Sequence, residues 1–179
     1  HVASKHGHLK IVQLIKDSID FGNPADAKGN SVLHYAAANG NLEIVQEMME
    51  DLQEKNPPAI NEEQFTPMHA AAISGHLIIV QEIKETTGIP NPSNQKGWSV
   101  LHSAAFHGHL EIVEYICSNL FEKNPAGQSA MANMTPIHKA SQAGHLEVVK
   151  FFHKILPILP MMAPLSGILI GRFMLLHMS

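Results

Sequence analysis

The chain has 179 residues, a formal net charge of −4 and no run rich in lysine and arginine, so nucleic acid is not expected as a general partner. Its one cysteine, Cys117, excludes a disulfide framework and favours a reducing compartment. The length is enough to bury a continuous core.

One short phrase built around a histidine recurs along the chain. The chain opens inside a copy at His1, and a degenerate start of a further copy surrounds His177. The four complete phrases are Ser31–Ala36, Thr66–Ala71, Ser99–Ala104 and Thr135–Ala140. Their histidines and His1 follow one another at intervals of 33, 35, 33 and 36 residues. Self-similarity at this period indicates a stacked array of identical units.

Each phrase predicts a short helix with clear start and stop signals. Thr66 and Ser99 precede apolar runs, and their hydroxyls can accept a hydrogen bond from an unpaired amide of the first turn. Pro67 and Pro136 fit that turn because proline lacks the amide. A glycine six residues after each histidine is expected to end the helix: Gly40, Gly75, Gly108 and Gly144.

A second helix is predicted behind each glycine, as in the phrase Gly108-His109-Leu110-Glu111-Ile112-Val113. The second copy shows the helical spacing of apolar residues at Leu42, Ile44, Val45, Met48 and Met49. We expect its acidic side chains to face water, and these are Glu43, Glu47 and Glu50. A pair of such helices cannot bury its apolar face alone, so stability must come from stacking.

A connecting loop follows the second helix, and an Asn-Pro pair marks it. The pairs lie 22 and 23 residues after their histidine in four copies: Asn23–Pro24, Asn56–Pro57, Asn91–Pro92 and Asn124–Pro125. The copies differ in length only after that proline, which places the insertions in this loop.

These phrases resemble the ankyrin repeat, whose signature is a Thr-Pro-Leu-His-x-Ala segment, a glycine turn and a Gly-His-Leu-Glu-Ile-Val segment. The resemblance covers residues 1–153 in about five copies. It implies an all-α solenoid of helix-turn-helix units joined by β-hairpin-like loops. It also implies that the repeated histidines are structural and hydrogen-bond to backbone and hydroxyl groups of the loop between copies: His34, His69, His102 and His138.

The thirteen histidines raise the question of a metal site, and the pattern argues against one. Ten belong to the two repeated phrases, and close pairs such as His107 and His109 straddle a turn and would need further ligands. There is no phosphate loop, nucleophile elbow or HExxH motif. We therefore expect no metal, no cofactor and no enzymatic activity; a metal-binding or enzymatic domain that uses the extra histidines is the least favoured reading.

Function is expected at the surface positions whose residues differ from copy to copy. In ankyrin-like arrays the variable contact positions are the hairpin tip and the two residues before the turn glycine. Large apolar residues gather there in copies three to five, which is typical of an interface anchored by aromatics with a polar rim. The predicted partner-binding residues are Phe65, Ile73, Trp98, Phe106, His107, Met134, Glu62, Glu63 and Lys96. The alternative is that these side chains pack across neighbouring copies.

The C-terminal stretch breaks the pattern. Residues 154–172 form an apolar segment rich in proline and methionine, and 173–179 resemble the truncated start of a sixth copy. An inserted loop folded back on the last copy is the first reading, a truncated end the second and membrane contact the third. Three prolines and the short apolar run disfavour a membrane span.

The sequence thus predicts a monomeric scaffold or adaptor that binds another protein through its concave face and hairpin tips. The alternative is a cytoplasmic ankyrin domain of a larger membrane protein or channel, with a tethering or gating role. The chain begins in mid-repeat without a signal peptide, so we expect a fragment of a longer protein. Its expected location is the cytoplasm or nucleus.

Overall fold

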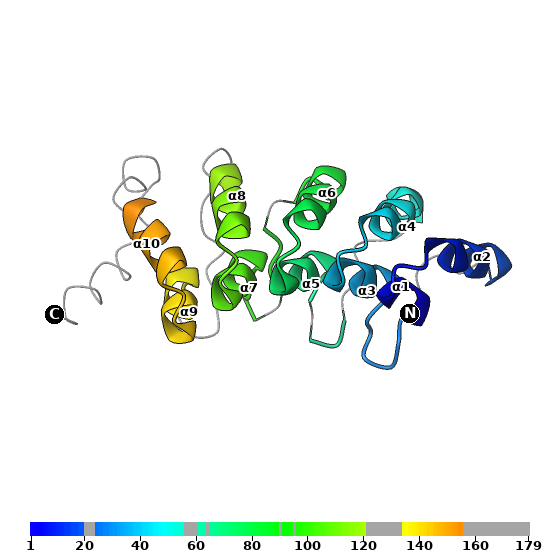
Figure 1. Cartoon of the computed structure of the whole chain (residues 1–179), viewed down its shortest axis with the longest axis horizontal. Coiled ribbons are helices and arrows are strands. Elements are labelled where there is room, and N and C mark those ends of the chain that lie inside the picture. Colours follow the sequence, from blue (N-terminus) through cyan, green and yellow to red (C-terminus); the bar gives the residue numbers. More distant parts are fainter. Residues whose placement is uncertain are drawn as a thin grey trace.

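The computed structural model describes residues 1–19, 24–55, 61–63, 65–89, 91–94, 96–120 and 134–155. They form five helix pairs stacked side by side along one axis (Figure 1). We number the copies one to five by His1, His34, His69, His102 and His138. The inner helices are α1 (Val2–Lys5), α3 (Val32–Ala38), α5 (Pro67–Ser74), α7 (Val100–His107) and α9 (Pro136–Ala143). The outer helices are α2 (Leu9–Ile19), α4 (Leu42–Lys55), α6 (Leu77–Thr87), α8 (Leu110–Leu120) and α10 (Leu146–Ile155).

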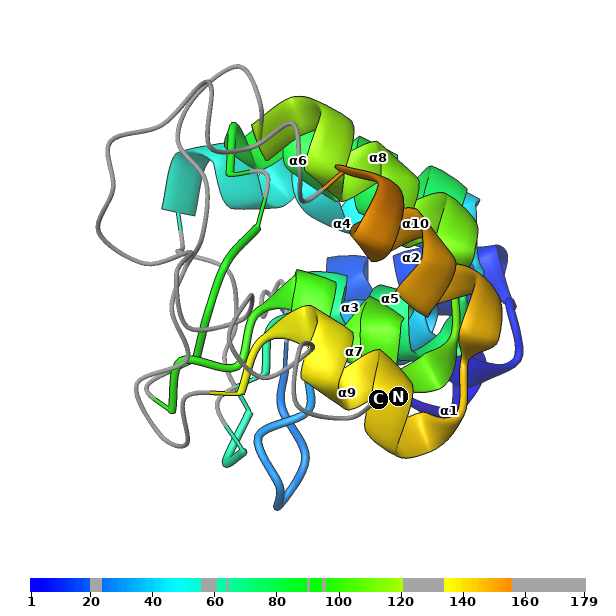
Figure 2. The ribbon, with the colours of Figure 1, turned by 90° about the vertical axis from the view of Figure 1, so that its left-hand side faces the viewer.

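The inner and outer helices form two layers, and the described hairpin segments before α3 and α5 project from the inner layer (Figure 2). Isolated antiparallel bridges join Ala25 to Ser31 and Ser93 to Ser99, which confirms the hairpin-like loops. The predicted all-α solenoid is therefore confirmed. α10 runs two residues past position 153, and the rest of the apolar segment and the sixth-copy start lie outside the described residues.

Small side chains let the inner helices approach one another closely. The paired alanines of copies two to four are completely buried: Ala36, Ala37, Ala71, Ala72, Ala104 and Ala105. A larger residue there would force the helices apart, because cores of native density have no room for added methylenes.

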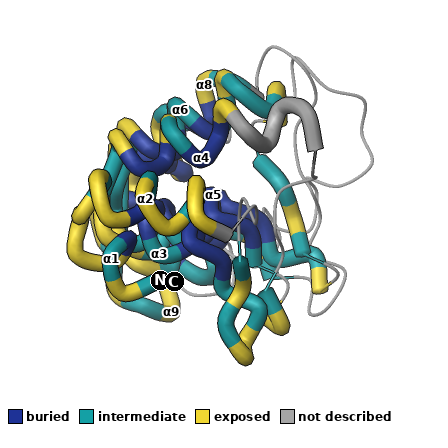
Figure 3. The backbone as a smooth tube through the Cα atoms, turned by 90° about the vertical axis from the view of Figure 1, so that its right-hand side faces the viewer, coloured by how far each residue is buried: buried dark blue, intermediate teal, exposed yellow. Residues whose placement is uncertain are grey.

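The core lies between the two layers, where the buried residues line the facing sides of the helices (Figure 3). The three central outer helices each contribute an apolar stripe to it: Ile44, Val45 and Met48 in α4, Ile79, Val80 and Ile83 in α6, and Ile112, Val113 and Ile116 in α8. Full burial of one such side chain stabilises the fold by about 1.5 to 3 kcal/mol. Most of this gain depends on the neighbouring copies.

The turn glycines end the inner helices as the sequence predicts. Gly75, Gly108 and Gly144 have φ values of 83°, 78° and 80°, in the left-handed region that a side chain disfavours. Gly75 and Gly108 are needed for a second reason. A Cβ atom on Gly75 would lie 2.7 Å from the His109 ring, and one on Gly108 would lie 2.4 Å from Nδ1 of His145.

Glu47 faces water only in part, since its side chain is 26% exposed. Its carboxylate lies between two outer helices and accepts hydrogen bonds from Gln13 Nε2 and Lys16 Nζ of α2, both at 2.8 Å. The Lys16 ammonium holds the pKa of Glu47 below its usual range. Gln46 donates to Glu82 at 2.9 Å in the same way one copy further on, so this side of the outer layer carries polar links between copies.

Candidate functional site

The repeated histidines bind the loop of the following copy and so position the predicted surface residues. Nε2 of His69 donates to the carbonyl of Trp98 at 3.1 Å, and Nε2 of His102 donates to that of Met134 at 3.0 Å. In the same way His34 donates to Phe65 at 2.9 Å. The three large residues on the loop side of the surface therefore have their backbone held by a buried side chain.

These imidazoles stay neutral. Nδ1 of His69 accepts from the amide of Thr66 at 3.2 Å and lies 2.9 Å from its hydroxyl, so this nitrogen faces a donor. Burial lowers the pKa of His69 to about 4 and also lowers the pKa values of His34 and His102. Protonation would place a hydrogen on Nδ1, which must instead accept a hydrogen bond. At neutral pH the histidines are therefore fixed hydrogen-bonding groups.

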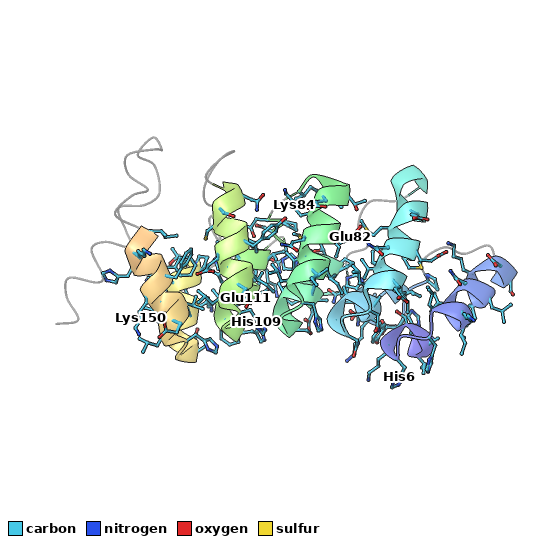
Figure 4. The ribbon with its side chains drawn as sticks, turned by 45° about the horizontal axis from the view of Figure 1, so that its top comes forward. His6, Glu82, Lys84, His109, Glu111 and Lys150 are labelled. Atoms are coloured by element: carbon cyan, nitrogen blue, oxygen red, sulfur yellow. The ribbon has the colours of Figure 1, made fainter. Side chains whose placement is uncertain are left out.

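A second row of histidines holds the other side of the same surface. His109 lies at the turn between α7 and α8 (Figure 4), and its Nε2 donates to the carbonyl of Ile73 in copy three at 2.9 Å. His145 donates to the carbonyl of Phe106 in copy four, also at 2.9 Å. Ile73 and Phe106 precede the turn glycines, so both edges of the predicted surface are tied to the neighbouring copy.

Trp98 and Phe106 form the centre of an aromatic cluster on the inner layer. Their ring centroids lie 6.1 Å apart with an edge-on angle of 70°, and both side chains are half-buried. The indole N–H donates to Oγ of Ser103 at 2.8 Å, and Nζ of Lys139 from copy five lies 4.9 Å from the indole centroid. A cation at this distance is attracted by the ring face.

The other predicted residues surround this cluster. Phe65 is half-buried, with its ring 5.2 Å from that of His69. His107 is exposed; it contacts the Phe106 ring at 5.2 Å, and its Nδ1 donates to the Ser103 carbonyl at 3.0 Å. Ile73 and Met134 are half-buried on either side.

The predicted polar rim lies on two adjacent hairpins. Glu62 and Glu63 are exposed in the hairpin of copy three, and Lys96 is exposed in that of copy four. Hydrogen bonds join neighbouring hairpins: the Glu62 amide donates to the carbonyl of Lys28 in the hairpin of copy two at 2.9 Å, and Asn94 Nδ2 in that of copy four donates to the Glu63 carbonyl at 3.4 Å. The exposed charged side chains therefore lie on hairpins that are bonded to one another.

Ser103 and Lys139 belong to the cluster, and sequence reasoning missed both. Each directly follows a repeated histidine, at the position that Tyr35 occupies in copy two. Tyr35 also points to this side, because its hydroxyl donates to Asp26 of the hairpin at 2.7 Å. The tyrosine hydroxyl holds the pKa of Asp26 at about 2. These residues would have been found if the position after each repeated histidine had been counted among the variable surface positions.

The described residues give little support for a metal site, a reactive thiol or a membrane crossing. They contain no group of three or more histidines, cysteines, aspartates or glutamates that could hold a metal ion. The Cys117 thiol is buried, which raises its pKa to about 12 and keeps it protonated. None of the helices in the described ranges has the length and apolar content that a membrane crossing needs.

Comparison with known proteins agrees with this architecture. The family model for ankyrin repeats (three copies) matches residues 1–89, 52–126 and 83–155, which together span most of the chain. A search of the curated proteins found no match. The helix pairs, glycine turns and hairpin loops are those of the matched family. The chain belongs to the ankyrin repeat family.

Proposed function

We propose that this chain is a scaffold or adaptor module that binds a protein partner across copies three to five, with Trp98 and Phe106 as anchors. Ankyrin repeats are generally protein–protein interaction modules and typically have no enzymatic activity. The observation that carries the proposal is the half-buried Trp98–Phe106 pair on the inner layer, at 6.1 Å between ring centroids. Large aromatic residues of this kind dominate the energetics of protein interfaces.

The surface is organised before a partner arrives, which favours tight binding. The carbonyls of Trp98 and Phe106 are held by His69 and His145, and the indole N–H is already bonded to Ser103. A partner therefore meets rings with few conformations to lose, and it leaves no buried indole N–H unpaired.

Charged side chains surround the aromatic centre and would set the orientation of the partner. Lys96 lies on copy four, and Glu62 and Glu63 lie one hairpin away in copy three. Rim charges of opposite sign on adjacent hairpins favour a partner with matching acidic and basic groups at similar spacing. We expect charge reversal there to change the association rate more than the dissociation rate.

We also propose that the module works inside the cell, in the cytoplasm or nucleus. The composition supports this setting, because the only thiol is a buried cysteine and no disulfide stabilises the array.

Affinity capture with matched variants tests the surface. The tagged chain is incubated with cell lysate, and the retained proteins are compared for wild type, Trp98→Ala with Phe106→Ala, and Ile78→Ala. Ile78 is 62% exposed on the outer helix α6 and serves as an apolar control in the other layer. We expect the double variant to lose partners that wild type and the control retain.

Thermal unfolding must be followed for all three proteins, because Trp98 also contacts Lys139 of the next copy. If the double variant unfolds cooperatively yet retains the same partners as wild type, the aromatic cluster is not the binding site. A charge-only variant, Lys96→Glu, leaves the packing untouched and provides a second measure of the same surface.

A further inference from the structure

One cation of copy five lies on the aromatic cluster of copy four. Nζ of Lys139 lies over the Trp98 ring, 4.9 Å from its centroid, and the lysine side chain is half-buried. Its described hydrogen bond is long, since Nζ donates to Oε1 of Gln142 at 3.4 Å. Among the described residues, no carboxylate forms an ion pair with this ammonium.

Other lysines of the chain do find carboxylates. Nζ of Lys16 lies 2.8 Å from Glu47, and Nζ of Lys150 lies 2.8 Å from Glu147, both on the outer helices. A lysine ammonium has three N–H donors, and a charge-assisted bond to a carboxylate is shorter and stronger than a bond to a neutral amide. A carboxylate supplied by a partner would therefore improve on the contact that Lys139 makes with Gln142.

The charged residues of the inner layer and its hairpins are divided by sign along the array. In copies four and five, the described hairpin and inner-helix residues include no aspartate or glutamate. Their ionisable side chains are those of Lys96, His102, His107, His138 and Lys139. The described acidic residues of this surface belong to copies two and three, and they are Asp26, Glu62 and Glu63. An acidic group is therefore favoured on the copy five side of Trp98.

The ammonium also lies beside apolar side chains that call for a different contact. Phe106 meets the indole edge-on, at 6.1 Å between ring centroids, and Met134 is half-buried at the start of copy five. A partner covers these side chains best with an apolar residue. Consecutive Cα atoms are about 3.8 Å apart, so a residue next to one that packs on the rings comes within reach of Lys139.

We propose that this surface recognises an acidic segment of its partner, in which an aspartate or glutamate binds the Lys139 ammonium beside an apolar residue packed on Trp98 and Phe106. The inference rests on the proposed function, because it names the chemistry of the partner at the same surface. Lys139 is then a specificity-determining residue: it selects among apolar segments by their charge, and it disfavours basic ones. The acidic end of the segment lies towards α9 and the other end towards α5 (Figure 1).

A phage-displayed library of short random peptides that lack tryptophan tests the preference. Trp98 is the only tryptophan of the chain, so its fluorescence reports whether a selected peptide reaches the site. We expect the wild-type chain to enrich peptides with an acidic residue beside an aromatic or aliphatic one, and these peptides to change the emission of Trp98. Lys139→Glu should enrich peptides with lysine or arginine at that position instead.

Affinities of one selected peptide, labelled and followed by fluorescence anisotropy, separate charge recognition from packing. Replacing the peptide's acid by its amide, or Lys139 by glutamine, should weaken binding about five- to tenfold, and both changes together should cost little more. Lys84→Gln is the matched control, because Lys84 is also half-buried but lies on the outer helix α6 (Figure 4). It should leave the affinity unchanged.

The outcomes distinguish this inference from the proposed function. The acidic preference is refuted if the selected peptides show no excess of aspartate and glutamate, or if Lys139→Gln weakens the acidic peptide and its amide version equally. In that case, peptides that still need Trp98 and Phe106 leave the proposed function intact. Both ideas fail if the wild-type chain enriches no peptide, or if the peptides bind Trp98→Ala with Phe106→Ala as tightly as wild type.

Discussion

Lowering the pH from 7.5 to 4.5 should destabilise the array, and titration of His69 should account for a large part of the loss. The imidazole has no solvent exposure, and burial lowers its pKa from 6.5 to about 4. The unfolded chain therefore binds a proton near pH 6.5 that the folded chain does not bind until about pH 4. Because the unfolded state binds more protons between these values, stability falls as the pH falls through that window.

The size of the effect follows from the two pKa values. Each unit of difference corresponds to about 1.4 kcal/mol. The neutral His69 thus contributes about 3 kcal/mol at neutral pH, most of which is lost by pH 4.5. This contribution is fully present above pH 6.5. His34 and His102 add to it in the same direction.

Urea unfolding at a series of pH values, followed by circular dichroism, measures this loss. His69→Gln keeps a donor for the Trp98 carbonyl but cannot titrate. It should be less stable than wild type at pH 7.5 by about 1 to 3 kcal/mol, through poorer bonding to Thr66. It should lose about 2 to 3 kcal/mol less than wild type between pH 7.5 and 4.5. Parallel losses in the two proteins would refute the reasoning, since carboxylate titration is common to both.

Two further predictions concern single residues. Gly108→Ala should destabilise the fold by about 1 to 3 kcal/mol more than Gly144→Ala. Both positions have positive φ, so the backbone strain is common to the two variants. A Cβ atom at position 108 would lie 2.4 Å from the His145 ring, whereas nothing lies within 4 Å of a Cβ atom at position 144. Equal free energies of unfolding would contradict the described packing of His145. Cys117 should resist iodoacetamide at pH 8 in the folded chain and react once urea unfolds it; rapid labelling of the folded chain would show that α8 opens easily.

The fold could be predicted almost entirely from the sequence because its signals are local and repeated. The cap at Thr66 and the turn at Gly75 each depend on residues within one copy, and the structure shows both. The repetition removed the usual ambiguity of short apolar runs, since several copies share one register.

The details of the site could not be predicted in the same way, because they depend on contacts between copies. The ammonium of Lys139 reaches Trp98 only through the stacking of copy five on copy four, and the sequence carries no sign of that direction. Glu47 was expected in water for a related reason: its helix position looks solvent-facing until α2 is placed beside it. The role of a side chain at a stacking interface depends on the residues of two copies, so one copy alone does not reveal it.

Hydrogen–deuterium exchange of the chain with its captured partner tests the central claim most directly. The account predicts slower amide exchange on binding in α5, α7 and α9 and in the hairpin segments beside Phe65 and Trp98, with the outer helices α6 and α8 unchanged. Protection confined to the outer helices, with none around Trp98, would contradict it.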